Sequence, residues 1–253
     1  MEYGICNLAI VPMRAEPSDR SEMVSQLLFG EAFEVAEYNN KWAKIVTAID
    51  GYTGWIDRLQ FVSLGHIAYK DLQQNPASLT YRAVTQAWKI EDNSIIYLAA
   101  GSSLAFLQGT TSYVGSKKFE IIGEIGETDH IANIARSYLN TPYLWGGRTH
   151  FGIDCSGYTQ VVYRLCGLNL QRDASMQVNQ GKLVENLAQT KLGDLAFFNN
   201  PEGRITHVGI ILNDGQIIHA SGKVKIDLLD NEGIWSEELK RYTHKLNVIK
   251  RFL

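Results

Sequence analysis

The spacing of apolar residues changes near residue 129, and this change limits the possible folds more than any other feature of the sequence. Upstream, short apolar or alternating runs of strand length are separated by turn residues such as Asn39-Asn40 and Asp50-Gly51. Downstream, apolar residues recur at i, i+3, i+4 and i+7 from Ile131 and again from Tyr158, which is the spacing of a helix face. Strand-like runs follow up to the C-terminus. The pattern predicts an α+β domain preceded by all-β structure.

Three domains are predicted from this division. Residues 1–64 and 65–127 each contain short strands at the spacing of a small β-barrel, without a residue-level repeat between the two. The polar segment 65–76 is expected to be a link. Residues 128–253 are expected to form two helices and then an antiparallel sheet from the runs 195–198, 208–212, 216–220 and 246–252.

Composition excludes several classes of protein. The net charge of −3 and the absence of a basic stripe argue against a nucleic-acid partner. No apolar run approaches the ~20 residues of a membrane span. The first 25 residues carry charges and no hydrophobic segment, so we expect a cytoplasmic protein, or a periplasmic or secreted one if a leader has been removed. Three cysteines without a CxxC motif indicate no disulfide framework and no metal site. We expect a monomer that needs no cofactor.

Cys155 stands at the predicted start of the second helix and is the candidate nucleophile. The first backbone N–H groups of a helix lack partners and favour negative charge, so this position is expected to lower the thiol pKa. The same N–H groups can hold the oxyanion of a tetrahedral intermediate. Taken alone, Cys155 could equally be a buried structural cysteine, and the two histidines that follow favour the catalytic interpretation.

His207 and His219 lie on consecutive predicted strands. If residues 213–215 form the loop between these strands, Gly209 lies opposite His219 and the two rings share one face of the sheet. A two-residue loop would instead place them on opposite faces. In the first case His207 is the base for Cys155, and His219 holds the far nitrogen of His207. The alternative is a pair of half-exposed strand histidines.

Five motifs in order resemble the NlpC/P60 family of cell-wall cysteine peptidases. They lie between about residues 131 and 253 and read Pro-Tyr-x-Trp-Gly-Gly, Asp-Cys-Ser-Gly, Gly-Asp-Leu-Ala-Phe-Phe, Thr-His-Val-Gly-Ile and Ile-His-Ala-Ser. The resemblance implies a papain-like catalytic core in which Cys155, His207 and His219 form the triad. The upstream region resembles bacterial SH3-like (SH3b) domains, the first segment more clearly than the second.

This domain order is similar to that of γ-D-glutamyl-L-diamino acid endopeptidases. The resemblance implies hydrolysis of the bond after D-Glu in peptidoglycan stem peptides with a free N-terminal L-Ala. Such a substrate needs a carboxylate for its amine, which Asp154 can supply, with Glu22 and Tyr52 of the first barrel assisting by resemblance. The resemblance also implies a cleft lined by other residues: Tyr143, which could assist the oxyanion, Trp145, Ser156, Ser175 on the D-Glu carboxylate, and Arg172.

Purely structural roles for some of these residues, and other functions for the protein, stay open at this point. Asp154 could be a helix cap, and Tyr143 and Trp145 could be core residues. The enzyme could instead be a wall-remodelling endopeptidase, amidase or acyltransferase on intact peptidoglycan. The chain could also be a non-catalytic SH3b wall-binding protein, which the presence of all three catalytic residue types argues against. The sequence leaves the diamino acid, meso-diaminopimelate or lysine, undetermined.

Overall fold

A computed structural model describes residues 2–123, 125–126, 129–213 and 215–253. The chain divides into two compact units, Met1–Thr128 and Asp129–Leu253. The predicted boundary between residues 127 and 128 falls on positions outside the described residues. No helix among the described residues is long and apolar enough to cross a bilayer.

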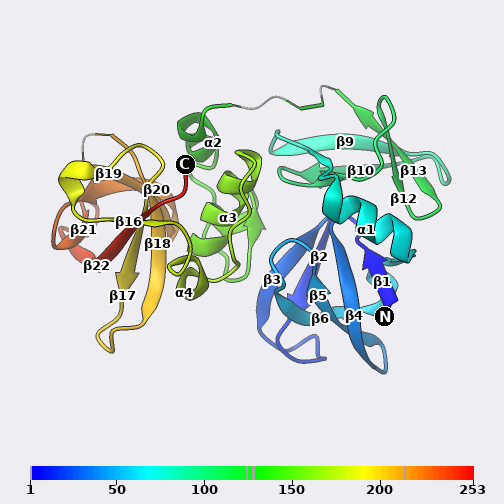
Figure 1. Ribbon diagram of the computed structural model, residues 1–253, viewed down its shortest axis with the longest axis horizontal. Helices are drawn as coiled ribbons and strands as arrows, with labels where there is room; N and C mark the ends of the chain where they lie inside the picture. Colours follow the sequence, from blue (N-terminus) through cyan, green and yellow to red (C-terminus); the bar gives the residue numbers. More distant parts are fainter. Residues whose placement is uncertain (1, 124, 127–128, 214) are drawn as a thin grey trace. The chain divides into compact units, whose positions relative to one another are not determined.

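The N-terminal part of the first unit is a curved, seven-stranded antiparallel sheet in the order β3-β2-β6-β5-β4-β1-β7 (Figure 1). Its elements are β1 (Glu2–Ile5), β2 (Ile10–Arg14), β3 (Met23–Leu28), β4 (Ala32–Asn39), β5 (Trp42–Thr47), β6 (Thr53–Asp57), the 3-10 helix η1 (Arg58–Gln60) and β7 (Val62–Leu64). Alternating side chains of these strands meet in a core around Val11, Phe33 and Ile45. The predicted SH3-like architecture of this segment agrees with this arrangement.

The rest of the first unit does not repeat that sheet. It contains α1 (His66–Gln74) and two smaller sheets, β10-β9-β13-β12 and β11-β8. Their strands are β8 (Ser78–Leu79), β9 (Val84–Lys89), β10 (Ser94–Ala99), β11 (Ser103–Leu104), β12 (Thr111–Val114) and β13 (Lys117–Ile122). Two closed SH3-like barrels are therefore not confirmed within the part of the chain that is described.

The second segment packs its apolar residues against the first segment, so it does not need to form a closed barrel with a core of its own. Phe119 packs edge-on against Phe29 of the preceding segment at 4.8 Å between ring centroids, within one buried cluster built from both segments. The expected link is also wrong in part, because residues 66–74 form α1. The ring of Tyr69 on this helix stacks on Tyr3 at 4.2 Å, which gives the otherwise polar segment one buried face.

The second unit has the predicted α+β order. It begins with α2 (Ile131–Ser137), the short strands β14 (Arg148–Thr149) and β15 (Gly152–Ile153), α3 (Cys155–Leu165) and α4 (Ala174–Gln177). There follow β16 (Lys182–Val184), the 3-10 helix η2 (Leu187–Gln189), β17 (Leu195–Asn199), β18 (Ile205–Ile211), β19 (Gln216–Ser221), β20 (Lys223–Leu229), β21 (Gly233–Ser236) and β22 (Arg241–Arg251). Helix α3 is fully buried and packs against β18 and β19.

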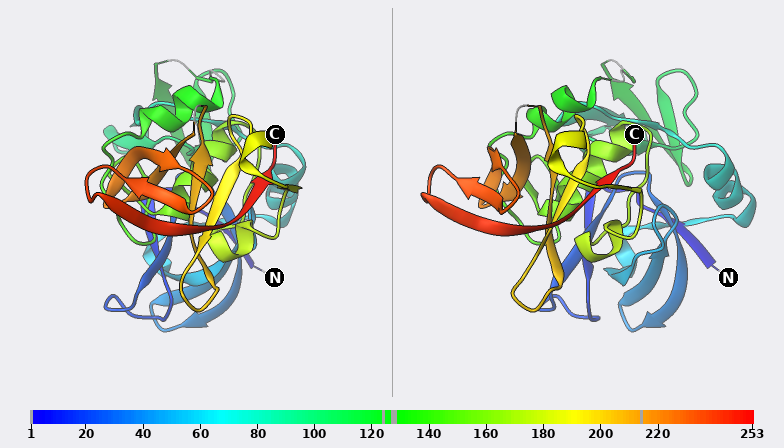
Figure 2. Two further views of the ribbon diagram at one scale, coloured as in Figure 1. Left: turned by 90° about the vertical axis from the view of Figure 1, so that its left-hand side faces the viewer. Right: turned by 60° about the vertical axis from the view of Figure 1, so that its left-hand side comes forward.

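The sheet of the second unit has the order β16-β22-β17-β18-β19-β20-β21, and β21 also pairs with β22. In Figure 2, β22 is the long red strand of this sheet. The sequence predicted the last strand over 246–252, whereas β22 begins at Arg241. Pairing of β22 with both β17 and β21 accounts for the extra length, and it brings His244 into the sheet.

Candidate active site

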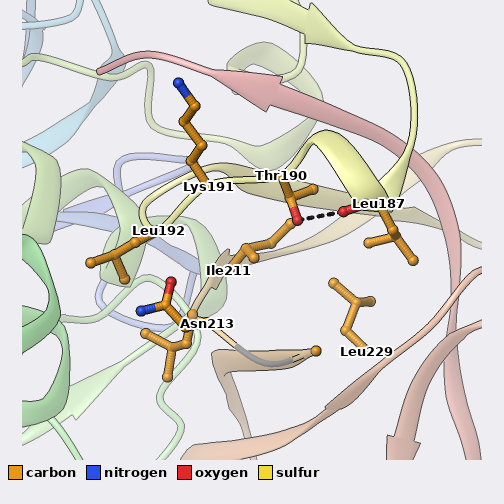
Figure 3. A pocket seen from close by; sticks show the side chains of 9 residues that line it. Leu187, Thr190, Lys191, Leu192, Ile211, Asn213 and Leu229 are labelled. Carbon is orange, nitrogen blue, oxygen red and sulfur yellow. Dashed lines mark hydrogen bonds between the residues drawn. The ribbon is translucent and has the colours of Figure 1, made fainter.

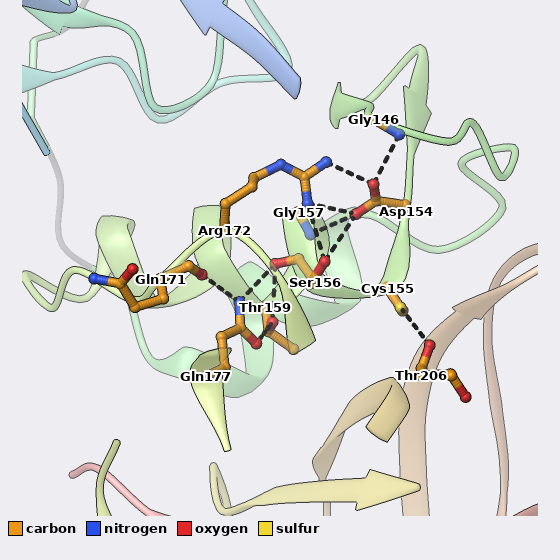
Figure 4. Close-up of polar contacts among 10 residues, drawn as sticks. All are labelled: Gly146, Asp154, Cys155, Ser156, Gly157, Thr159, Gln171, Arg172, Gln177 and Thr206. Carbon is orange, nitrogen blue, oxygen red and sulfur yellow. Dashed lines mark hydrogen bonds and ion pairs between the residues drawn. The ribbon is translucent and has the colours of Figure 1, made fainter. Parts of the chain in front are cut away.

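Cys155 is the first residue of α3 and lies against β18. Asp154 caps the helix with its side chain, which accepts a hydrogen bond from the backbone N–H of Gly157 at 2.6 Å. The Sγ atom of Cys155 lies 4.0 Å from the carbonyl oxygen of Thr206, directly before His207 (Figure 4). The predicted position of Cys155 at a helix start, next to the strand of the candidate base, is confirmed.

The expected lowering of the thiol pKa is wrong. Burial raises the pKa of Cys155 to about 12, and the negative charge of Asp154 acts in the same direction. The positive charge of Arg172 and the backbone N–H groups of Val208 and Ser156 oppose this rise without cancelling it. Only 6% of Cys155 is exposed, so the rise in pKa from desolvation of the sulfur outweighs the lowering expected from the helix start. Burial therefore favours the neutral thiol form of this candidate nucleophile.

His207 and His219 meet on one face of the sheet, as the longer loop predicts. Strands β18 and β19 pair Ile210 with Ile218 and Ile211 with Ile217, and this register continues to Gly209 opposite His219. The Nε2 atom of His207 lies 2.8 Å from the Nδ1 atom of His219. The middle residue of the predicted loop, Asp214, lies outside the described residues.

Asp227 extends this pair into a hydrogen-bonded series. It is buried on β20, and its Oδ2 atom lies 3.1 Å from the Nε2 atom of His219. An ionised carboxylate only accepts hydrogen bonds, so Nε2 of His219 carries the proton and Nδ1 accepts from Nε2–H of His207. The Nδ1 atom of His207 is thereby left unprotonated, as a base requires. Burial raises the pKa of Asp227, but hydrogen bonds from His219 and Lys225 outweigh it and keep the carboxylate ionised.

Burial also keeps the imidazoles neutral. It lowers the pKa of His207 well below the usual value, and the repulsion that a protonated His207 would meet from protonated His244 or His219 and from Lys225 adds to this. The ring of His244 on β22 stacks on that of His207 at 4.0 Å between centroids and an interplanar angle of 23°. A neutral thiol beside a neutral imidazole fits proton transfer during attack better than a resting ion pair.

Arg172 and Asp154 form a buried ion pair behind the nucleophile. The guanidinium donates through Nη1 to Oδ1 at 3.0 Å and through Nη2 to Oδ2 at 2.5 Å, and Nη1 also donates to Oγ of Ser156 at 2.9 Å (Figure 4). The backbone N–H of Gly146 donates to Oδ2 of Asp154 at 2.8 Å. Both carboxylate oxygens thus already accept hydrogen bonds within the unit. Asp154 is a helix cap, and its role in binding a substrate amine stays a prediction.

Gln177 on α4 fixes the segment that carries Arg172. Its Nε2 atom donates to the carbonyl oxygens of Ser156 at 3.0 Å and Gln171 at 2.8 Å, and its Oε1 atom accepts from Thr159 at 2.8 Å (Figure 4). The structure therefore ties residues 171–177 to the first turn of α3. Ser175 is exposed on α4, with its carbonyl accepting from Asn179 at 3.1 Å, and its proposed contact with substrate stays a prediction.

The remaining predicted cleft residues are placed by the loop before α3. Tyr143 is half-buried and donates its backbone N–H to Gly222 at 2.9 Å. Burial raises its pKa, and the negative charge of Asp154 and the repulsion from a Cys155 thiolate act in the same direction, so its hydroxyl is a neutral donor. The side chain of Trp145 is 59% exposed, so it is not a core residue.

Glu22 and Tyr52 belong to the first unit. Glu22 is exposed directly before β3, and its carbonyl accepts from the backbone N–H of Ala15 at 3.0 Å. Tyr52 is half-buried directly before β6, and its N–H donates to Oγ1 of Thr47 at 2.9 Å. Their predicted part in binding the substrate amine stays a prediction.

A pocket of about 400 Å³ lies elsewhere in the second unit, at the end of β18 away from His207 (Figure 3). Aliphatic and polar side chains line it: Leu187, Thr190, Lys191, Leu192, Ile211, Leu212, Asn213, Gly215 and Leu229. It contains no residue predicted for the site.

The fold and the site together define a thiol hydrolase, with a cysteine at a helix start next to a hydrogen-bonded pair of histidines. Residues 140–244 match the NlpC/P60 family, and residues 13–60 match the bacterial dipeptidyl-peptidase Sh3 domain. The chain therefore contains a cysteine peptidase domain of the NlpC/P60 family and an N-terminal bacterial SH3 domain, and the resemblance drawn from the motifs is confirmed.

Relatives match over most of the chain. The gamma-D-glutamyl-L-lysine dipeptidyl-peptidase of Bacillus subtilis (strain 168) is 29% identical over 85% of this chain and 78% of its own length. Dipeptidyl-peptidase 6 of Lysinibacillus sphaericus is 29% identical over 86% of this chain and 88% of its own length. The crystal structure of an NlpC/P60 family protein from Bacillus cereus ATCC 10987 shares the fold, with a TM-score of 0.82 at 18% identity over 99% of both chains.

Sequence reasoning missed Asp227 and His244. Asp227 stands in the run Lys-Val-Lys-Ile-Asp-Leu-Leu, and an acidic residue inside an apolar strand next to that of His219 was the available signal. His244 was missed because the last strand was predicted to begin after it.

Proposed function

We propose that the protein hydrolyses the γ-D-Glu–L-diamino acid bond of peptidoglycan stem peptides that have a free N-terminal L-Ala. The observation that carries the chemistry is the series from His207 through His219 to Asp227, which leaves Nδ1 of His207 free as a base. The thiol of Cys155 lies against the same strand, 4.0 Å from the carbonyl oxygen of Thr206. The bond specificity rests on the two dipeptidyl-peptidase relatives, whose similarity extends through both units.

In the proposed reaction Cys155 attacks the γ-carbonyl carbon of D-Glu while its proton passes to Nδ1 of His207. Backbone N–H groups at the start of α3, assisted by the neutral hydroxyl of Tyr143, hold the oxyanion. The C–N bond then breaks, and His207 returns the proton to the leaving amine of the diamino acid. A water molecule, deprotonated by His207, attacks the thioester; the C–S bond breaks, L-Ala-D-Glu is released, and His207 returns the proton to the sulfur of Cys155. Side chains and water suffice for every step.

The proposed substrate is a peptide released from the wall, and a monomer suffices to act on it. We assign the recognition of the D-Glu carboxylate to Arg172, Ser156 and Ser175. Recognition of the free amine is assigned to Asp154 with Glu22 and Tyr52. The carboxylate oxygens of Asp154 already accept hydrogen bonds from Arg172, so a substrate amine would have to share them. Asp154 would therefore attract the amine mainly through its negative charge.

Cleavage of L-Ala-γ-D-Glu-meso-diaminopimelate, its lysine counterpart and their N-acetylated forms, read by mass spectrometry, tests the proposal. We expect cleavage after D-Glu in the free-amine peptides and at least about 100-fold slower cleavage of the acetylated ones, since acetylation removes the positive charge of the amine, and with it the hydrogen bonds that the proposed amine site makes. Equal rates on both would contradict free-amine recognition and favour wall remodelling. Cys155→Ala should fold normally and show no turnover, and residual activity in it would exclude Cys155 as nucleophile.

A further inference from the structure

The three histidines of the active site form a cluster that the hydrolytic reaction does not fully use. His207, His219 and His244 each offer one ring nitrogen, and these three atoms lie within 4.8 Å of one another. His207 and His219 are buried, and His244 is half-buried. In the reaction above, His207 transfers protons and His219 orients it, whereas His244 has no assigned part. We propose that this cluster, here called the three-histidine site, binds a zinc ion that reversibly inhibits the peptidase.

The distances between the three ligand nitrogens are close to those of a zinc site. Zinc binds imidazole nitrogens at about 2.0–2.1 Å, so the nitrogens of a tetrahedral site stand about 3.3 Å apart. The nitrogens of His207 and His219 are 2.8 Å apart and would separate by about 0.5 Å. The third nitrogen would move inward by no more than about 1.5 Å. The ring of His244 stacks on that of His207, so the half-buried His244 side chain must also turn out of the stack to point its nitrogen at the ion. Water takes the fourth position.

The outer contacts of the rings resemble those of metal-bound histidines. A histidine that binds a metal through one nitrogen usually donates its other N–H to a carboxylate or another oxygen. His219 does so toward Asp227 at 3.1 Å, which leaves Nδ1 as its ligand atom. The Nδ1 atom of His244 lies 2.9 Å from Oγ1 of Thr243, which leaves Nε2. The carboxylate of Asp227 also supplies negative charge, against the positive charge of Lys225 at 3.1 Å from it.

Zinc at this position would stop catalysis through the tautomer of His207. A nitrogen that binds a metal carries no proton, so ligation through Nε2 moves the single imidazole proton to Nδ1. Nδ1 is the atom that accepts the proton of Cys155, and a protonated Nδ1 cannot do so. Imidazole ligands favour zinc, copper or nickel over magnesium and calcium, so inhibition should be selective for this class of ion.

Isothermal titration of ZnCl2 into the full-length Cys155→Ala variant tests the site without the thiol as a competing ligand. We expect one zinc ion per chain and no heat with MgCl2. Adding His244→Phe, which keeps an aromatic ring to stack on His207, should weaken binding at least 10-fold. Adding His130→Phe, which replaces an exposed histidine outside the cluster, should leave binding unchanged. No zinc uptake by Cys155→Ala, or equal uptake after His244→Phe, would overturn the site.

A second measurement tests inhibition in the protein with its thiol intact. Zinc should slow peptide cleavage and EDTA should restore it. The zinc concentration for half inhibition, measured against each variant's own zinc-free rate, should rise at least 10-fold in His244→Phe and stay constant in His130→Phe. An unchanged value in His244→Phe would show that zinc acts through Cys155 instead. The calorimetric arm needs no substrate, so a failure of the proposed peptide specificity leaves the zinc site testable.

Discussion

Asp227 lies 3.1 Å from the Nε2 atom of His219, on the side of the ring opposite to His207. An acceptor at this position fixes the tautomers of two successive rings. When Nε2 of His219 donates to Asp227, Nδ1 of His219 must accept from Nε2–H of His207, and Nδ1 of His207 is left without a proton. The effect of Asp227 thus reaches a base that it does not contact. This places a fourth residue behind the predicted triad, on the strand next to that of His219.

Asp227→Asn is expected to lower kcat on the stem peptide by about 10²–10⁴-fold while leaving the fold intact. The amide can donate to Nε2 of His219, which reverses both tautomers and puts a proton on Nδ1 of His207. Lys225→Met is the matched control, since it removes the other partner of Asp227 but keeps the carboxylate. Steady-state kinetics with circular dichroism checks the prediction. A loss in Asp227→Asn no larger than that in Lys225→Met would contradict the role assigned to Asp227.

Gly209 leaves space for His219 on the neighbouring strand. A Cβ atom at position 209 would lie 2.9 Å from Cβ of His219 and 2.8 Å from Cδ1 of Ile217. The Ile217 side chain can rotate away, whereas Cβ of His219 is fixed to the backbone. Gly209→Ala should therefore displace the ring and lower kcat by about 10–100-fold.

Two further variants isolate this effect. Adding Ile217→Ala to Gly209→Ala removes both Ile217 atoms that an added Cβ would meet, Cδ1 and Cγ1, and should not restore kcat. Gly65→Ala, where an added Cβ meets nothing within 4 Å, is expected to behave as wild type. Full activity of Gly209→Ala would show that β18 and β19 separate without moving His219.

Local spacing predicted the parts of the fold that depend on local periodicity. The two helices around Ile131 and Cys155 follow from a period of 3.6 along the sequence. The shared face of His207 and His219 follows from a period of 2 only with the longer of the two loops that the sequence allowed. Pairing across distant segments is not encoded in this way. The early start of β22 depends on its pairing with β21, and the packing of Phe119 on Phe29 replaces a second barrel core.

The direction of the pKa shift of Cys155 was predicted wrongly for a similar reason. The helix start is visible in the sequence, but the depth at which α3 packs against β18 is not. Desolvation depends on that depth and dominates the pKa of the thiol. The pairing of Arg172 with Asp154 was missed because eighteen positions separate the two residues and no periodic pattern links them.

Arg172→Met is expected to destabilise the second unit by about 3–5 kcal/mol, because it leaves the carboxylate of Asp154 buried beside Cys155 without its ion-pair partner. The side chains are only 1% and 7% exposed, so water cannot replace the guanidinium. Arg172→Lys keeps the charge but loses the two-pronged geometry and should cost less. Calorimetric unfolding of the three proteins gives the ranking. Equal stability of the Met variant and wild type would mean that the pair adds nothing to folding.

His150 should make the stability of the protein depend on pH. Its ring stacks on Tyr138 at 3.6 Å between centroids, and among the described residues its buried Nδ1 atom has no hydrogen-bond partner. Burial lowers the pKa of His150 from 6.5 to about 4. Between these values the unfolded chain binds the proton and the folded chain does not, so the free energy of unfolding falls as the pH drops through this window.

His150→Phe keeps the stacked ring and removes the titrating nitrogens. Urea unfolding at pH 7 and pH 4.5 should therefore show a smaller acid loss in His150→Phe than in wild type, by at most about 3 kcal/mol. The remaining loss in the variant includes the contributions of His207, His219 and His244, whose pKa values are lowered by burial in the same direction. His130→Phe, at an exposed site, should keep the wild-type difference. An identical acid loss in His150→Phe and wild type would mean that His150 is already protonated in the folded protein or becomes hydrated before the chain unfolds.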